Sequence, residues 1–444
     1  MAVSAIDVRY SGPMNAVFDE ENKLARWLEV EAALAMAHAE LGDIPREAAT
    51  EIARKANVRA VKLERAKEIE SQVGHDMMAV VKALSEKCAG GAGGFVHLGA
   101  TSYDIEDTAT ALIFRDALAL YEKRLAALKK TLMRQAALHK HTVCIGRTHG
   151  QHAVPTTYGL KFAVWACEVD RHLERLGEAR KRILVGKMTG AVGTMATFGN
   201  NAFRLQASVM KLLGLKPVLA STQVIQRDRH AEIISLLSLS ACTCEKIAKE
   251  IRNLQRTEIM EVAEPFGKTQ VGSSTMPHKR NPHKSERVCS LARVVRSGLQ
   301  VAMENIALEH ERDLTNSANE RIIFPESFIL TDYVLAQTTE IVSGLEFFPE
   351  RIACNLKMSR GLVMAERLMV LLTRKGMNRQ EAHELLREAS RRAIKNKVHL
   401  KAELSADPGV LKYLSPAEIG EAFKEESYVG KAVEIVERAL KSLS

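Results

Sequence analysis

The chain has 444 residues, of which 46% are hydrophobic and 26% charged, and its formal net charge is +9. This composition excludes collagen-like, low-complexity and largely disordered chains, and the length allows a large core and about three domains. Acidic and basic residues alternate, as in EENKLARWLEVE, so the net charge indicates solvated helix faces more than a nucleic-acid partner.

The seven cysteines form no CxxC pair, and only Cys242 and Cys244 lie close together in the sequence. Such a set is typical of a reducing compartment in which the thiols are buried or idle. The first residues lack a signal-peptide pattern, and no apolar run reaches the roughly 18 residues of a membrane span. We therefore expect a cytoplasmic protein without a membrane partner.

Long helices are predicted because prolines are rare, and none lies between Pro45 and Pro155. Asp19 is a suitable N-cap for a helix that ends near Leu41, where Gly42 follows. Shorter helices follow this one before a glycine-rich break.

Thr101 and Asp104 have the spacing of a capping box. The helical pattern continues from Asp104 to about residue 141. Strand-like alternation is confined to 142–146 (TVCIG) and 191–198 (AVGTMATF). Further long helices are predicted from apolar periodicity over 155–183, 222–263, 283–312 and 320–345.

These elements predict an all-α protein of three domains. They are a small N-terminal domain (1–103), a central bundle of long helices (104–348) and a small helical C-terminal domain (349–444). One chain can hardly cover the apolar stripes of such long helices, so we also expect contacts between subunits.

The segment 267–283 interrupts the helical pattern with glycines, serines, prolines and cationic side chains. This composition is typical of a mobile anion-binding loop, and a plain solvated linker is the alternative. Asn281 and Pro282 have the pattern of an N-cap and a first helical residue, which would place the positive end of a helix dipole at the loop.

A second loop, Gly146–His152, carries His149 and His152. Their spacing suits a metal pair, but no carboxylate or cysteine stands at ligand spacing, so we expect no metal. The sequence also lacks GxSxG, GxxxxGK[ST] and strand-associated GxGxxG motifs, which argues against α/β-hydrolases, P-loop proteins and Rossmann proteins.

A third cluster combines His97 with Thr101 and Ser102 at a predicted helix N-terminus. Free N–H groups at such an end favour an anion, and ordinary capping is an equally good explanation. His75 and Asp76 begin another helix and have the pattern of a capping pair.

The loop Gly272–Pro282 (GSSTMPHKRNP) resembles the signature loop of the fumarase/aspartase superfamily. Within it the chain resembles the adenylosuccinate lyase family over nearly its whole length. The motifs that carry this resemblance are Arg9-Tyr10, His75-Asp76, Thr101-Ser102-x-Asp104, GRTHG at 146–150, STQVIQRDRH at 221–230, Ser285-Glu286-Arg287, and HERD at 310–313 followed by Ser317 and Arg321.

The resemblance implies a homotetramer with a 20-helix core, in which each active site takes its loops from three subunits. It also implies a β-elimination that releases fumarate from adenylosuccinate to give AMP, and from succinylaminoimidazole carboxamide ribotide to give the carboxamide ribotide, in purine biosynthesis. No cofactor is implied.

The resemblance also implies the residue roles. Ser273 would be the base, with Lys279 and nearby N–H groups lowering its pKa, because a serine hydroxyl does not ionise unaided. His149 would be the acid that protonates the leaving nitrogen, and Glu286 would orient it. The implied substrate contacts are Arg9, Tyr10, His75, Asp76, Thr101, Ser102, Gln223, Ser274, Met276, Asn281, Arg287, Arg312, Ser317 and Arg321.

Three other functions stay open at this point. A cycloisomerase acting on a carboxymuconate shares the loop motif but would not need a phosphate clamp. Argininosuccinate lyase usually differs at the positions of His278 and Arg280. A helical scaffold or nucleic-acid binder would leave the combination of Ser273, His149 and Lys279 unexplained. The chain departs from the family pattern at Gly74, Val154 and Glu309, which bears on substrate contacts.

Overall fold

The computed structural model describes residues 4–267 and 269–444. It is mainly helical, as the sequence predicts, and its strands are few and short. Contacts between residues divide the chain into two compact units. Unit 1 comprises the described residues up to Ala126 together with Arg171–Cys244 and Ser290–Ala336, and unit 2 comprises Ala127–Asp170, Glu245–Cys289 and Gln337–Ser444. The three-domain division and the tetramer stay predictions.

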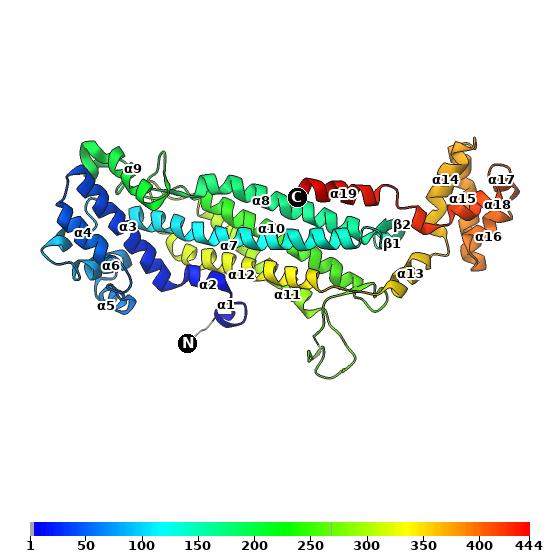
Figure 1. The fold of residues 1–444 in the computed structure, drawn as a ribbon, viewed down its shortest axis with the longest axis horizontal. Helices are drawn as coiled ribbons and strands as arrows, with labels where there is room; N and C mark the ends of the chain where they lie inside the picture. The colour runs from blue at the N-terminus through cyan, green and yellow to red at the C-terminus, as the bar shows by residue number, and fades with distance from the viewer. Residues whose placement is uncertain (1–3, 268) are drawn as a thin grey trace. The chain divides into compact units, whose positions relative to one another are not determined.

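Five long helices each contribute residues to both units (Figure 1). Most predicted starts and ends are close to the observed ones. The helix predicted over 222–263 is shorter at both ends, and the helix predicted over 283–312 ends at Glu304. The five helices are α7 (Ser102–Leu138), α8 (Tyr158–Ile183), α10 (Asp228–Leu254), α11 (His283–Glu304) and α12 (Ser317–Ser343).

Side-chain pairs join these helices within each unit. In unit 1, Arg124 Nε of α7 lies 2.6 Å from Asp332 Oδ1 of α12. In unit 2, Lys129 Nζ of α7 lies 2.8 Å from Asp170 Oδ1 of α8. Partly buried pairs of this kind fix the rotation of neighbouring helices, while the apolar side chains between them supply most of the stability.

In unit 1, α3 (Glu20–Leu41) and the shorter helices that follow it build one core with the start of α7. Asp19 caps α3 by accepting the Asn22 N–H at 2.6 Å, and Gly42 ends α3 with a φ of 82°, both as predicted. The short elements are α1 (Ala5–Val8), α2 (Pro13–Phe18), α4 (Arg46–Lys55), α5 (Leu63–Val73), α6 (Asp76–Ser85), η1 (Ala92–Phe95), η2 (Ala196–Asn201) and α9 (Ala202–Leu213).

Unit 2 holds an antiparallel hairpin and a separate helical core. The hairpin consists of β1 (Val143–Thr148), which the sequence predicts, and β2 (Gln151–Thr157), which it does not. The remaining helices are α13 (Pro349–Lys357), η3 (Leu362–Met364), α14 (Ala365–Arg374), α15 (Arg379–Asn396), α16 (Leu400–Ser405), α17 (Pro408–Leu411), α18 (Pro416–Ala422), η4 (Glu425–Ser427) and α19 (Ala432–Leu443).

Two further strand pairs are very short. β3 (Val185–Gly186) runs parallel to β4 (Lys216–Pro217), and β5 (Val262–Ala263) runs antiparallel to β6 (Glu346–Phe347). The predicted strand over 191–198 is wrong. Gly190, Gly193 and Met195 all have positive φ there, which breaks the extended backbone and leaves turns that lead into η2.

The seven cysteines are all free thiols. Within the described residues, no helix is both long and apolar enough to cross a bilayer.

Candidate active site

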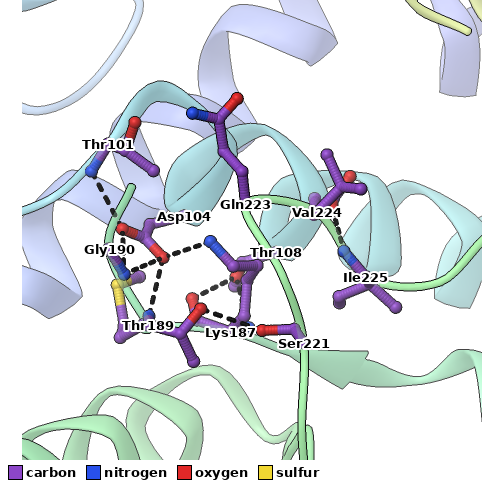
Figure 2. A network of polar contacts seen from close by, with 12 residues as sticks. Thr101, Asp104, Thr108, Lys187, Thr189, Gly190, Ser221, Gln223, Val224 and Ile225 are labelled. Atoms are coloured by element: carbon purple, nitrogen blue, oxygen red, sulfur yellow. Dashed lines mark hydrogen bonds and ion pairs between the residues drawn. The ribbon is translucent and has the colours of Figure 1, made fainter. Parts of the chain in front are cut away.

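A buried carboxylate organises the N-terminus of α7 in unit 1 (Figure 2). Asp104 is fully buried, and its Oδ2 accepts the Thr101 N–H at 2.9 Å, which is half of the predicted capping box. Its Oδ1 accepts the Thr189 N–H at 2.8 Å and an ion pair from Lys187 Nζ at 2.6 Å. Asp104 therefore joins the turn that carries Thr101 and Ser102 to the segment after β3.

The Lys187 partner is also fully buried, so both charges of this pair are removed from water. A buried charge is costly without a partner, and here backbone N–H groups add to the ion pair. Thr108 reinforces the contact, because its Oγ1 donates to the Lys187 carbonyl and accepts the Lys187 N–H, both at 3.0 Å. The turn that holds Thr101 is thereby fixed.

The same network holds the segment that carries Gln223. The Thr189 and Ser221 hydroxyls lie 2.9 Å apart, and the Ile225 N–H donates to Asp107 Oδ2 at 2.7 Å. Figure 2 shows these segments meeting around the first turns of α7. The structure thus brings Thr101, Ser102 and Gln223 into one region of unit 1.

Arg312 lies next to Gln223 and has unused hydrogen-bonding capacity. Its Nη1 donates to Gln223 Oε1 at 2.9 Å, and its guanidinium lies 3.6 Å from the centre of the Tyr103 ring. Tyr103 in turn donates to Ser317 Oγ at 3.3 Å. The Nε and Nη2 atoms of Arg312 are buried and have no partner among the described residues. Buried N–H donors without an acceptor favour an anionic ligand.

Arg321 follows Ser317 by one turn of α12 and pairs with Asp76, its Nη2 lying 2.6 Å from Asp76 Oδ2. Burial opposes ionisation of Asp76, but the Arg321 hydrogen bond and charge hold the pKa of Asp76 below its usual value. The neighbouring His75 is the N-cap of α6, and its Nδ1 accepts the Met78 N–H at 3.5 Å. The capping prediction for His75 is confirmed.

A cavity of about 260 Å³ lies beside these residues in unit 1 and is lined in part by Tyr103, Ser317 and Arg321. Lys23 and Glu106 also line it. Burial raises the pKa of Glu106 to about 7 and lowers the pKa of Lys23. Lys23 and Glu106 therefore line the same cavity as Ser317 and Arg321.

No hydrogen bond, ion pair or ring contact joins Arg9 or Tyr10 to Arg312 within the described residues. Arg9 is exposed; its backbone N–H donates to the Ala5 carbonyl at 2.9 Å, and its side chain forms no hydrogen bond or ion pair with any residue of 4–267 and 269–444. Tyr10 packs edge-on against Tyr333, with ring centres 5.2 Å apart. The contact of both residues with substrate stays a prediction.

The β1–β2 hairpin of unit 2 presents His149 at its tip. His149 and Gly150 form the two-residue turn and have φ values of 53° and 75°, the positive values of a type I′ turn. A histidine tolerates this region better than a β-branched residue does. The His149 side chain is exposed, so a tight turn rather than burial fixes its direction.

Ser273 lies in the 267–283 loop, which belongs to unit 2 and has no helix or strand among its described residues before α11; Lys268 lies outside them. The Ser273 Oγ accepts the Met276 N–H at 3.1 Å and the Thr275 N–H at 3.4 Å. Two donors aimed at one hydroxyl oxygen stabilise negative charge on it.

The loop is closed on itself behind Ser273. Asn281 Nδ2 donates to the Gly272 carbonyl at 2.9 Å, and a Cβ on Gly272 would meet the Lys279 carbonyl oxygen at 2.0 Å. Glycine is required at this close approach. The predicted N-cap role of Asn281 is wrong, because α11 begins at His283.

The structure does not join the other predicted site residues of unit 2 to one another. Ser274, Met276, Lys279 and Glu286 are exposed, and no hydrogen bond or ion pair joins Glu286 to His149 within the described ranges. Arg287 is half-buried on the first turns of α11. Their roles stay predictions.

The structure gives His97 and His152 local surroundings that explain them without a ligand. The His97 Nδ1 lies 2.6 Å from Glu31 Oε1, and Glu31 is buried. His152 is half-buried on β2, where burial and the nearby Arg147 cation lower its pKa. The part of the chain described by the structure contains no group of three or more side chains suited to a metal ion.

Sequence reasoning did not single out Lys187 or Tyr103. A lysine in the apolar stretch LVGKMTG was a usable signal, because a charge there needs a buried partner. Tyr103 lies between two residues of a quoted motif, but only the fold places its ring under Arg312.

Comparisons with known proteins point to one family. A family model described as Lyase matches residues 9–297, and one described as Adenylosuccinate lyase C-terminus matches residues 361–439. The chain is 56% identical to the adenylosuccinate lyase of Pyrococcus abyssi, over 99% of this chain and 98% of that protein. It is 52% identical to that of Methanocaldococcus jannaschii, over 100% and 96%.

Solved structures share the fold but not one activity. A fumarate lyase from Mesorhizobium sp. BNC1 superposes with a TM-score of 0.90 at 35% identity, covering 96% of this chain and 97% of that one. A 3-carboxy-cis,cis-muconate lactonizing enzyme from Pseudomonas putida also gives 0.90, at 34% identity, covering 99% and 98%. The sequence relatives are therefore more discriminating than the fold.

Proposed function

The chain belongs to the adenylosuccinate lyase family of the fumarase/aspartase superfamily and is a lyase, and we propose how its residues perform the reaction. The substrate is adenylosuccinate, which yields AMP and fumarate, and the second substrate is succinylaminoimidazole carboxamide ribotide. The reaction is a β-elimination that breaks a carbon–nitrogen bond.

The observation that carries the substrate class is the Arg312 guanidinium. It is stacked on Tyr103, tied to Gln223 through one nitrogen, and its other two nitrogens are buried without a partner in the described chain. A nucleotide phosphate satisfies such a fork. Ser317 and Arg321, on the first turns of α12, complete the clamp in this proposal, with Arg9 and Tyr10.

Elimination begins with removal of a proton from the succinyl carbon beside a carboxylate. Ser273 takes this proton, and the two N–H groups at its Oγ support the alkoxide that does so. The electron pair left on carbon forms the double bond of fumarate as the C–N bond breaks. His149 gives a proton to the departing nitrogen, and Glu286 orients His149.

Lys279 and Asn281 bind the fumaryl carboxylates in this proposal, together with Ser274 and Met276 of the same loop. Thr101 and Ser102 hold the succinyl group at the fixed N-terminus of α7, and His75, Asp76, Gln223 and Arg287 contact the remainder of the substrate. Fixed donors of this kind stabilise the dianionic intermediate without reorganising.

We propose a cytoplasmic homotetramer in which loops from three subunits form each site. Two features support a shared site. No hydrogen bond or ion pair joins His149 to Glu286 within the described residues, and the site residues fall into two sets, one in each compact unit.

Incubation of the pure protein with adenylosuccinate is expected to produce AMP and fumarate in equal amounts, because one C–N cleavage yields both. Absorbance follows the reaction, and chromatography quantifies the products. A carboxymuconate and argininosuccinate serve as the competing substrates. Turnover of either one without turnover of adenylosuccinate would contradict the proposal.

Arg312→Lys is expected to raise KM for adenylosuccinate about 10- to 100-fold while kcat changes little, since lysine can neither form the fork nor stack on Tyr103 in the same way. Steady-state kinetics and inhibition by AMP measure the loss. Arg182→Lys is the control, because that arginine forms an exposed pair with Glu232. An unchanged KM in the Arg312 variant would remove this residue from the clamp.

A further inference from the structure

Two buried carboxylates flank the short strand β5 in unit 2. Glu261 and Glu264 enclose Val262 and Ala263, and both glutamates are at most 1% exposed. Residues three apart on an extended strand point to opposite faces, so the two carboxylates reach different parts of the unit.

Glu261 accepts hydrogen bonds from three elements. Its Oε1 accepts from Arg147 Nη2 at 2.5 Å and from Asn355 Nδ2 at 2.9 Å. Its Oε2 accepts from the Tyr158 hydroxyl at 2.5 Å. Burial, followed by the Glu261 charge, raises the pKa of Tyr158, so the phenol stays a donor.

These donors bracket the hairpin that presents His149. Arg147 lies on β1 two residues before His149, and Tyr158 directly follows the last residue of β2. Glu261 therefore ties β1 and the residue that follows β2 to one buried point. The pairing of β1 with β2 is irregular between Ile145 and Arg147. The contacts of Glu261 therefore hold the tip of the hairpin in place where the strand pairing is interrupted.

Glu264 holds the other proposed catalytic segment. Its Oε1 accepts the Lys284 N–H at 3.0 Å, and its Oε2 accepts the Ser285 N–H at 2.8 Å and the Ser285 hydroxyl at 2.7 Å. These are first-turn donors of α11, so Glu264 caps the helix at which the Ser273 loop ends.

Gln255 extends this anchor into the loop. Its Oε1 accepts the Glu264 N–H at 3.0 Å, and its Nε2 donates to the Arg280 carbonyl at 3.0 Å. Arg280 belongs to the loop itself. The loop is thus held from its C-terminal side by the same buried segment that holds the hairpin.

We propose that Glu261 and Glu264 are positioning residues for the reaction, Glu261 for the acid His149 and Glu264 for the loop that carries the base Ser273. This inference rests on the roles proposed above for His149 and Ser273. Neither glutamate touches substrate. Each acts through the segment that it anchors, and the two anchors directly flank the two-residue strand β5.

If the two carboxylates only stabilise the fold, replacing either one by glutamine should lower activity and stability to the same extent. A positioning role predicts opposite kinetic signatures, because the proton is removed by one anchored segment and the nitrogen is protonated by the other. Adenylosuccinate carrying deuterium at the succinyl position that loses its proton distinguishes the two roles.

Glu261→Gln is expected to lower kcat about 10- to 100-fold, because misplacing a catalytic group by up to about 1 Å has effects of that size. Protonation of nitrogen becomes slow while proton removal stays fast and reversible. Recovered substrate therefore exchanges its deuterium for solvent hydrogen faster, relative to turnover, than with the unmodified chain. Mass spectrometry of recovered substrate measures the exchange.

Glu264→Gln is expected to lower kcat by a similar factor with the opposite signature. Removal of the proton becomes the slow step, so recovered substrate keeps its deuterium and the primary isotope effect on kcat increases. Equal exchange and equal isotope effects in the two variants would overturn the proposal.

Asp332→Asn is the matched control, because its carboxylate is also buried and pairs with Arg124 of unit 1 rather than with the hairpin or the loop of unit 2. It is expected to lower the thermal midpoint without changing either isotope readout. If a Gln variant fails to fold, Tyr158→Phe and Ser285→Ala each remove one donor from Glu261 and Glu264, and the same two signatures are expected at smaller size.

Turnover of adenylosuccinate by the unmodified chain distinguishes a failure of the proposed function from a failure of the positioning roles. Absence of adenylosuccinate turnover in the unmodified chain would contradict the proposed function. Normal turnover in that chain, combined with unchanged kcat and exchange in both glutamate variants, would contradict only the positioning roles.

Discussion

Replacement of Ser273 by alanine is expected to lower kcat for adenylosuccinate about 10³- to 10⁴-fold, the size of effect expected for loss of a general base. The Ser273 Oγ is the acceptor of two backbone N–H groups, at 3.1 and 3.4 Å, and alanine leaves these donors without a charge to stabilise. Single-turnover and steady-state kinetics measure the loss, and circular dichroism checks that the helical fold is retained.

Ser274→Ala is the matched comparison for this variant. It removes the neighbouring hydroxyl from the same exposed loop, and a loss of at most about tenfold is expected because that hydroxyl binds substrate at most. A larger loss in Ser274→Ala than in Ser273→Ala would reassign the base to the second serine.

The second large effect is expected at His149. His149→Asn keeps a residue that tolerates positive φ at the hairpin tip, where φ is 53°, and lowers kcat about 10²- to 10⁴-fold because the departing nitrogen is no longer protonated. His152→Asn, on the following strand, is the control for loss of an imidazole in this hairpin. Near-normal kcat in His149→Asn would exclude His149 as the acid.

Mixing the two inactive variants tests where the two residues meet. If one site takes His149 and Ser273 from different subunits, random exchange leaves about one quarter of the sites with both residues intact. Activity is therefore expected to return after denaturation and refolding of an equal mixture. Continued inactivity after exchange has been verified by mass would show that one subunit supplies both residues.

Sequence reasoning located the helices well and the irregular segments less well. Asp19 and Gly42 predict the ends of α3 because capping depends on residues within one turn. The alternation of 191–198 predicts a strand, but the positive φ values at Gly193 and Met195 depend on the packing around them, which the alternation does not report. The second hairpin strand was missed because it pairs only with β1.

For the candidate site, motifs identified the residues but not their surroundings. Arg312 was predicted as a phosphate ligand, and the structure adds the Tyr103 ring beneath it and the Gln223 amide beside it. Asn281 was predicted as a helix cap, yet Glu264 accepts the first-turn N–H groups of α11 instead. A cap supplied from twenty residues away has no local pattern.

The sequence by itself determined the helical class, the three polar loops and the family, because propensity, capping and motif spacing are properties of neighbouring residues. Only the tertiary structure decided which charges are buried together. Asp104 and Lys187 are 83 residues apart, and Arg147 and Glu261 are 114 apart. A charge enters the interior only where the fold supplies its partner, and that partner comes from whichever segment packs there.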